Sequence, residues 1–185
     1  AIEDECGTCD ADYYNNCVQD CAETWGGDAE VDECGICDGN GPEYECWDGV
    51  LECDELDCSD APENYPDWQD DPGGYLFVQT IAGGLVLYDG EQIAEDGDIL
   101  AALDNEGNVR GVGVQLTPPF GPYEGSIIYD MTMRSNADGD VLSFQYYDAS
   151  EDAILGISET YSFVSNEQQG DVFEPVSYNV SAPDL

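Results

Sequence analysis

Residues 32–41, DECGICDGNG, contain a cysteine motif that has already appeared at residues 4–10 as DECGTCD. Each copy opens with C-x-x-C, and seven or eight residues separate its second cysteine from its third. Cys58 lies outside both copies, and no cysteine follows it. The first third of the chain is therefore expected to need cross-links that the rest does not. The aligned cysteines are Cys6, Cys9, Cys17 and Cys21 in the first copy, and Cys34, Cys37, Cys46 and Cys53 in the second.

The chain is strongly acidic. Its 185 residues include 43 acidic side chains and two basic ones, Arg110 and Arg134, for a formal net charge of −41, with no lysine or histidine. A nucleic-acid partner is excluded, because binding a phosphate backbone requires cationic side chains. Repulsion among the carboxylates opposes compaction, so we expect either bound cations or a very salty medium to offset it, and calcium is the cation that such oxygen ligands suit. Without histidine there is no His-activated nucleophile and no His-ligated metal, and we expect no enzymatic activity.

The cysteine content predicts where the protein works. Nine cysteines within 58 residues are typical of a disulfide framework, which forms in an oxidising, extracellular or cell-surface environment. The sequence begins at Ala1 rather than methionine, as cleavage of a signal peptide would leave it. No run approaches the roughly 18 apolar residues of a membrane span, and we expect none.

Residues 1–58 have few apolar side chains with which to fold. Ordering the backbone costs about 1–2 kcal/mol per residue, and burying a large apolar side chain contributes about 1.5–3 kcal/mol. Disulfides, worth about 2–4 kcal/mol each, are expected to supply much of the rest, together with metal ions or another subunit. The apolar anchors are Ile2, Val18, Trp25, Val31, Ile36, Trp47, Val50, Leu51 and Leu56.

Other interpretations of the cysteines stay open at this stage. Cys6, Cys9, Cys34 and Cys37 have the spacing of a four-cysteine zinc site, although five cysteines would then be unexplained. A redox-active C-x-x-C normally opens a helix, which this segment does not predict. Because nine is odd, one cysteine is left as a buried thiol or a bond to another chain, and Cys58 is our candidate.

Residues 17–41, CVQDCAETWGGDAEVDECGICDGNG, resemble the DCAGxWGGxAxxDECGxCxGxG repeats of secreted and surface-attached proteins of many, often marine, bacteria. The resemblance covers about the first 60 residues, and position 23 is Glu where the family usually has Gly. It implies an extracellular spacer or interaction segment with no known catalysis. The matching residues are Asp20, Cys21, Ala22, Trp25, Gly26, Gly27, Ala29, Asp32, Glu33, Cys34, Gly35, Cys37 and Gly39.

The sequence changes character after the cysteine-rich segment at residues 1–58. Residues 59–74, SDAPENYPDWQDDPGG, have the composition of a Pro/Gly linker, with Trp68 as an anchor. From residue 75 short alternating runs follow, and DNEGN at 104–108 and NADGD at 136–140 predict hairpin turns. We expect a mostly β fold, an antiparallel β-sandwich at 75–185 preceded by a small, irregular, disulfide-rich segment. The predicted strands are 75–81, 85–88, 99–103, 109–116, 125–134, 141–148, 159–164 and 176–180.

The best-patterned strands predict part of the core. Tyr129, Met131 and Met133 alternate with polar residues, following Ile127, and a similar pattern recurs in the strand at 141–148. These side chains are expected on the buried face. In the second strand they are Leu142, Phe144 and Tyr146.

Three groups of oxygen-bearing side chains are candidate calcium ligands. Each also fits an ordinary solvated turn, and the third lacks the distal glutamate of an EF-hand. The groups are Asp32, Asp38 and Asn40; Asp96 and Asp98 with Glu95 and, across a hairpin, Asp104; and Asn136, Asp138 and Asp140.

Other candidate sites carry less information. Tyr123, Tyr146 and Tyr147 either form a sugar-binding platform or pack in the sandwich, which we prefer. Asn179 begins an N-glycosylation sequon, Asn-Val-Ser. Paired carboxylates for glycoside hydrolysis cannot be recognised among 43 acids.

Two functions follow from these observations. The first is an extracellular structural subunit that self-assembles into a fibre or surface layer as a homo-oligomer or polymer, stabilised by disulfides and calcium, through exposed sheet edges. The alternative is a secreted carbohydrate- or cell-surface-binding module, with a glycan partner and the cysteine-rich segment as spacer.

Overall fold

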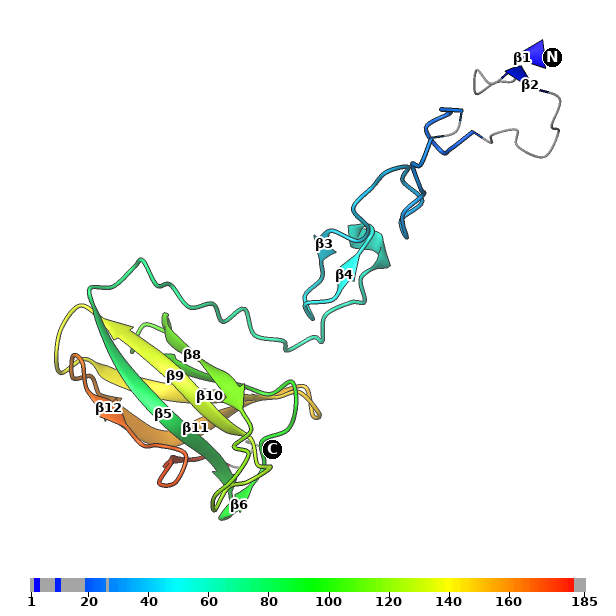
Figure 1. The fold of residues 1–185 in the computed structure, drawn as a ribbon. Helices are drawn as coiled ribbons and strands as arrows, with labels where there is room; N and C mark the ends of the chain where they lie inside the picture. The colour runs from blue at the N-terminus through cyan, green and yellow to red at the C-terminus, as the bar shows by residue number, and fades with distance from the viewer. Residues whose placement is uncertain (1, 4–8, 11–18, 26, 182–185) are drawn as a thin grey trace. The chain divides into compact units, whose positions relative to one another are not determined.

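The computed structural model describes residues 2–3, 9–10, 19–25 and 27–181. The chain divides into two compact units, Ala1–Ala61 and Pro62–Leu185 (Figure 1). The first contains the cysteines and the second the large sheet. The expected fold class, mostly β and antiparallel with a small irregular disulfide-rich segment in front, is confirmed.

Unit 1 has little regular secondary structure. Its short elements form two-stranded pairs, β1 with β2 and β3 with β4, followed by a single 3-10 turn, η1. Local turns and disulfides therefore determine its conformation. The elements are β1 (Ile2–Glu3), β2 (Cys9–Asp10), β3 (Tyr44–Glu45), β4 (Leu51–Glu52) and η1 (Glu55–Asp57).

One five-residue turn recurs in unit 1, starting at Asp20, Asp32 and Cys46. In the second copy Asp32 N–H donates to the Ile36 carbonyl at 2.9 Å, and Gly35 N–H donates back to the Asp32 carbonyl at 3.0 Å. The fourth residue needs a positive φ, which is 79° at Gly35 and 62° at Glu23. Glu23 therefore adopts the left-handed conformation that Gly35 has at the same position of the second copy, and the two copies share one turn geometry.

Unit 2 is a curled, mainly antiparallel sheet, a half-barrel, whose strands run in the order β11-β10-β7-β8-β9-β5-β12, with β6 and β13 also on β5. β12 and β13 are the strands parallel to β5. An isolated bridge between Ile157 of β11 and Val180, the residue after β13, brings β11 close to β13. The strands are β5 (Phe77–Tyr88), β6 (Glu91–Gln92), β7 (Ile99–Leu103), β8 (Val109–Leu116), β9 (Ile128–Ser135), β10 (Val141–Asp148), β11 (Ala153–Ser162), β12 (Gln168–Gln169) and β13 (Val176–Asn179).

The sheet turns its corner within β8. The first half of this strand pairs with β7, through Gly111 and Val112, and the second half pairs with β9 from Gly113 to Leu116. A Cβ on Gly111 would lie 2.7 Å from the Thr132 carbonyl oxygen, and one on Gly113 would lie 2.9 Å from the Tyr129 ring. The two glycines therefore allow β8 to lie close against β9 where the sheet changes partner.

The predicted alternation of β9 and β10 is confirmed by the core. Tyr129, Met131 and Met133 are buried, whereas Ile127 is partly buried at the edge of the cluster. Side chains from both arms of the curl meet in one interior. The buried cluster is Ile81, Val86, Leu100, Ala102, Tyr129, Met131, Met133, Leu142, Phe144, Tyr146, Ile157, Phe163, Tyr178 and Val180.

Two sequence predictions about strands were wrong in their boundaries. The predicted strands 75–81 and 85–88 are one strand, β5, because the chain forms a bulge between Ile81 and Gly84 rather than a turn. Ile81 pairs with Met131 and Gly84 with Tyr129, so two residues, Ala82 and Gly83, lie opposite one residue of β9. The last long strand, β11, begins at Ala153 rather than 159, since it follows the β10 turn directly.

The segment expected as a linker at 59–74 belongs mainly to unit 2. Asn64 Nδ2 donates to the Asp152 carbonyl at 2.9 Å, and the Tyr65 ring lies edge-on to Tyr147 with centroids 5.5 Å apart. Pro66 is buried. Residues 62–76, which we call the strap, therefore lie along the sheet unit rather than moving as a free connection.

Both basic residues of the chain hold the strap. Arg134 donates to both oxygens of Asp70, through Nε and Nη2 at 2.8 Å each. The Arg110 guanidinium lies 4.2 Å from the centroid of the Tyr75 ring and is paired with Asp104 at 2.9 Å. The two basic side chains of the sequence, against 43 acidic ones, therefore both contact the strap.

Within the described ranges, no helix has the length and apolar character needed to cross a membrane.

Replacing Gly83 with alanine is expected to destabilise unit 2 by about 1–3 kcal/mol. The new Cβ would lie 2.4 Å from the Asp171 carbonyl oxygen, so a backbone must shift. Chemical denaturation measures the change. Gly156→Ala in β11 is the control, since nothing lies within 4 Å of its Cβ position, and equal losses in both variants would contradict the role of Gly83.

Breaking the ion pair of the strap is expected to increase the mobility of residues 67–73. Arg134→Gln removes the bidentate pair with Asp70, which is partly exposed, so the loss in unfolding free energy is about 1 kcal/mol. Hydrogen exchange should rise at residues 67–73. Asp67→Asn, which removes a strap carboxylate outside the ion pair, is the matched control; unchanged exchange in Arg134→Gln would contradict the assignment.

Candidate interaction surface on the disulfide unit

Three disulfides link the described part of unit 1. They join Cys21 to Cys37, Cys34 to Cys53 and Cys46 to Cys58, with Cα–Cα distances of 5.4, 5.4 and 5.6 Å. Each bridge begins before the preceding one has closed, so the three loops overlap along the chain. We call this arrangement the disulfide ladder.

The ladder corrects two sequence interpretations. Cys58 was our candidate for the unpaired or intermolecular cysteine, and that was wrong because Cys58 is bonded to Cys46. Cys34 and Cys37 are bonded to other cysteines, so they are not available as ligands of a four-cysteine zinc site. The pairing of Cys6, Cys9 and Cys17 lies outside the described side chains.

Large apolar side chains of unit 1 lie on its surface. Among its residues with described burial, the only buried hydrophobic residue is Cys46, whereas Leu56 is 92% exposed and Ile36 60%. The disulfides do not form a buried interior in their place, because Cys53 is exposed and the other bridged cysteines, apart from Cys46, are only partly buried. We call the exposed set the apolar surface of unit 1: Trp25, Val31, Ile36, Tyr44, Trp47, Val50, Leu51 and Leu56.

Part of this surface surrounds a hollow of about 300 Å³ beside the Cys46–Cys58 bridge. Tyr44 and Trp47 line it together with Ala61. Trp47 is held in place by a hydrogen bond from Nε1 to the Ser59 carbonyl at 2.8 Å. The hollow thus combines two aromatic side chains, of which Trp47 is held by a hydrogen bond, with acidic neighbours.

The first group of candidate calcium ligands is used differently from what the sequence predicted. Asp32 Oδ1 accepts from the N–H groups of Cys34 and Ile36, and Oδ2 accepts from Gly41 N–H at 2.9 Å. These hydrogen bonds, above all the one from Ile36, lower the pKa of Asp32. Asn40 donates to Glu43, and Asp38 has a φ of 54° in the following turn.

The repeat aspartate also explains a glycine seven residues later. A Cβ on Gly39 would lie 2.0 Å from Asp32 Oδ2, and one on Gly27 would lie 1.9 Å from Asp20 Oδ2. Only glycine leaves room for the carboxylate that organises each turn. The Asp and Gly positions of the resemblance motif are therefore explained by one turn, without a ligand.

The second group of candidate calcium ligands does not gather around one point either. Asp98 is buried and accepts from Glu95 N–H, Ala149 N–H and the Tyr146 hydroxyl. Asp104 caps the β7–β8 turn with Asn108 and Arg110 and does not join Asp98. Asp96 is exposed.

In the third group each side chain ties a different segment. Asn136 Oδ1 accepts from Leu76 N–H at 3.0 Å, Asp138 accepts from Ser165 N–H at 2.6 Å, and Asp140 accepts from the Ser135 hydroxyl. Across the described residues, no three or more Cys, Asp or Glu side chains gather as a metal site.

The electrostatics of Asp104 show what these carboxylates do. Burial alone would raise its pKa, but hydrogen bonds from the Asn108 side chain, from the N–H groups of Asn108 and Glu106, and from Arg110 lower it to about 2. Its turn, from Asp104 to Asn108, has the hydrogen bonds of the Asp32 turn. The same Asp-headed turn therefore occurs in both units.

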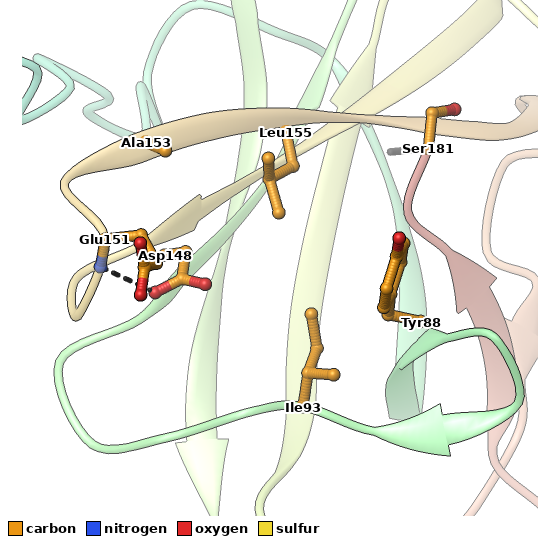
Figure 2. Close-up of a pocket in the computed structure, with 7 residues that line it drawn as sticks. All are labelled: Tyr88, Ile93, Asp148, Glu151, Ala153, Leu155 and Ser181. Atoms are coloured by element: carbon orange, nitrogen blue, oxygen red, sulfur yellow. Dashed lines mark hydrogen bonds between the residues drawn. The ribbon is translucent and has the colours of Figure 1, made fainter. Parts of the chain in front are cut away.

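A pocket of ligand size lies between the two ends of the curl of the sheet unit. It measures about 340 Å³ and is largely apolar, with Leu155 of β11 and Ile93 facing each other across it (Figure 2). Tyr88 and Ser181 close one side, and Asp148 and Glu151 the other (Figure 2). One aromatic side chain, that of Tyr88, lines the pocket and is 45% exposed.

The predicted tyrosine platform is not formed by β10. Tyr146 and Tyr147 are buried, in line with the packed interpretation, and Tyr123 is half-buried in a separate loop. Burial raises the pKa of Tyr147 to about 12, with a further contribution from its hydrogen bond to Asp152. Asn179 of the sequon is exposed and contacts Glu159 through its amide group.

Comparison with known proteins gives no match: no family model, curated protein or solved structure is significantly similar to the chain.

The low pKa of Asp104 predicts a pH-dependent loss of stability. Its carboxylate stabilises the folded state at any pH above the ordinary value of about 3.8, and this contribution is lost as the pH falls towards 2. The difference in unfolding free energy between the parent protein and Asp104→Asn should therefore be constant above pH 4 and shrink below it. Urea unfolding against pH measures it. The control, Asp96→Asn, removes the same charge from an exposed position; an equal pH dependence there would contradict the prediction.

Proposed function

We propose that this protein is an extracellular structural subunit that self-assembles into a fibre or surface layer, stabilised by disulfides and calcium. The observation that carries the proposal is the apolar surface of unit 1, where Leu56, Ile36 and Val31 are each more than half exposed. Burying each such side chain against a partner would contribute about 1.5–3 kcal/mol. The proposed role is structural and not catalytic.

The occupant we propose for this surface is another copy of the chain. A partner in solution would have to cover exposed apolar side chains on a strongly acidic chain. A second copy offers matching apolar side chains. The short strands of unit 1 also have free edges that another chain can extend.

Charge explains why calcium belongs in the proposal. Each copy has a formal charge of −41, so contacts between copies bring carboxylates together. Arg110 and Arg134, the only basic side chains of the sequence, are both paired within the chain. Ion pairs of arginine with a carboxylate of another copy are therefore not available, and the proposed way to offset the repulsion is a divalent cation shared between carboxylates of two copies, with a very salty medium that screens the charges as the alternative.

The cysteine count supports a covalent contribution. Six of the nine cysteines are joined in the ladder, and the three others cannot all pair with one another. In the oxidising environment that the disulfides favour, a bond to a second chain is the proposed fate of the remaining thiol. The repeat resemblance, with its extracellular spacer and interaction segments, supports the same localisation.

Electron microscopy of the purified protein tests assembly. Fibres or sheets are expected with millimolar calcium, and single particles after chelation. The double variant Leu56→Ser with Ile36→Ser should raise the calcium concentration needed for assembly or abolish it. The control pair, Phe120→Ser with Phe173→Ser, changes exposed apolar side chains of unit 2, and should assemble normally. Single particles of the parent protein at every calcium concentration would overturn the proposal.

A further inference from the structure

We infer a mechanical function for unit 1 that is independent of assembly: the disulfide ladder makes it a tether of limited length, in which two routes of almost equal length share the load. The inference rests on the order of the three bridges along the chain. It concerns a force that pulls residue 21 away from residue 61, where unit 1 ends.

The first route uses two bridges. It crosses from Cys21 to Cys37, returns three residues to Cys34, crosses to Cys53 and continues eight residues to Ala61. At about 3.3–3.6 Å per extended residue, with 5.4 Å for each bridge, this route is taut at about 50 Å. The 40 residues between Cys21 and Ala61 would extend to about 140 Å without bridges.

The second route uses the third bridge. It crosses from Cys21 to Cys37, continues nine residues to Cys46, crosses to Cys58 and needs three more residues to Ala61. It is only one residue longer than the first route, so its taut length is also about 50 Å. Beyond Cys37 the two routes therefore become taut almost together and divide the force.

Because of this arrangement, either of the two bridges beyond Cys37 can open without a large change in the taut length of the tether. If either Cys34–Cys53 or Cys46–Cys58 opens, the other route still limits the tether within a few ångströms. If both open, 24 residues separate Cys37 from Ala61, and the tether lengthens by about 40 Å. If the disulfides served only to stabilise unit 1, the two routes would not need to have nearly equal taut lengths.

The load continues into unit 2 through the strap. Residues 62–76 precede β5, and the pair of Arg134 with Asp70 holds them on the sheet before the chain enters that strand. β5 is hydrogen-bonded to β9 on one side and to β12 and β13 on the other. A force that leaves unit 1 thus reaches an interior strand of the sheet.

Single-molecule extension of the full chain tests the inference. Peptide tags at both ends carry DNA handles, and the force is kept below that which unfolds unit 2. Cys46→Ser with Cys58→Ser should leave the taut length unchanged, and Cys34→Ser with Cys53→Ser should lengthen it by about 5 Å or less. The variant that lacks both bridges should be about 40 Å longer. All other segments are common to the variants and cancel.

A second measurement needs no substitution and therefore leaves the disulfide pairing of the parent protein unchanged at the start. Adding a phosphine reductant to the parent protein under constant force should give no step when Cys46–Cys58 opens first, or a step of about 5 Å or less when Cys34–Cys53 opens first. A step of about 40 Å should follow when the second of the two bridges opens. Opening of Cys21–Cys37 alone should give about 30 Å. A gain of about 40 Å on loss of either bridge singly, or none on loss of both, would overturn the inference. Peptide mapping confirms the pairing in each variant.

Discussion

Unit 1 depends on covalent closure because it has almost no apolar interior. Its described apolar side chains lie outside, and Cys46 is the buried exception. The overlap of the three bridges matters more than their number, since each loop shares residues with the next. Separate loops would constrain three local segments and leave the joints between them free. Overlapping loops pass the constraint along the chain, so that one irregular segment behaves as one unit.

Carboxylate side chains stabilise several turns of this chain by accepting hydrogen bonds from backbone N–H groups. Asp20, Asp32 and Asp104 each head a turn and accept two N–H groups on the same oxygen, from the second and fourth residues that follow. Such hydrogen bonds favour the ionised form and turn an acidic residue into a local staple. A sequence with 43 acids can therefore fold, because some of the charges are held where N–H groups offset them. The rest of the acidic surface still opposes close approach by another copy.

The sequence predicted the class of both units but not their connections. Alternation in β9 and β10 identified Tyr129, Met131 and Phe144 as core residues, because a half-buried strand has period two. Pairing of Cys58 could not be predicted, since nine cysteines permit many connectivities. The strap resembled a linker because its contacts depend on residues far along the chain, such as Arg134. The role of Asp32 had a local signal, the D-x-x-G spacing with a second glycine seven residues on, which a turn explains as well as a metal does.

The two units are stabilised by different physical means and therefore fail under different conditions. Unit 2 contains no cysteine, so reducing agents leave its stabilising interactions untouched, whereas heat or denaturant acts directly on its buried cluster. Unit 1 offers heat and denaturant little buried apolar surface to expose, while reduction removes the bridges on which it depends. An oxidising environment preserves the bridges of unit 1 and leaves the buried cluster of unit 2 unaffected, so both units are stable there. This separation also permits the ladder to carry force while the sheet stays folded, since loss of structure in one unit does not require loss in the other.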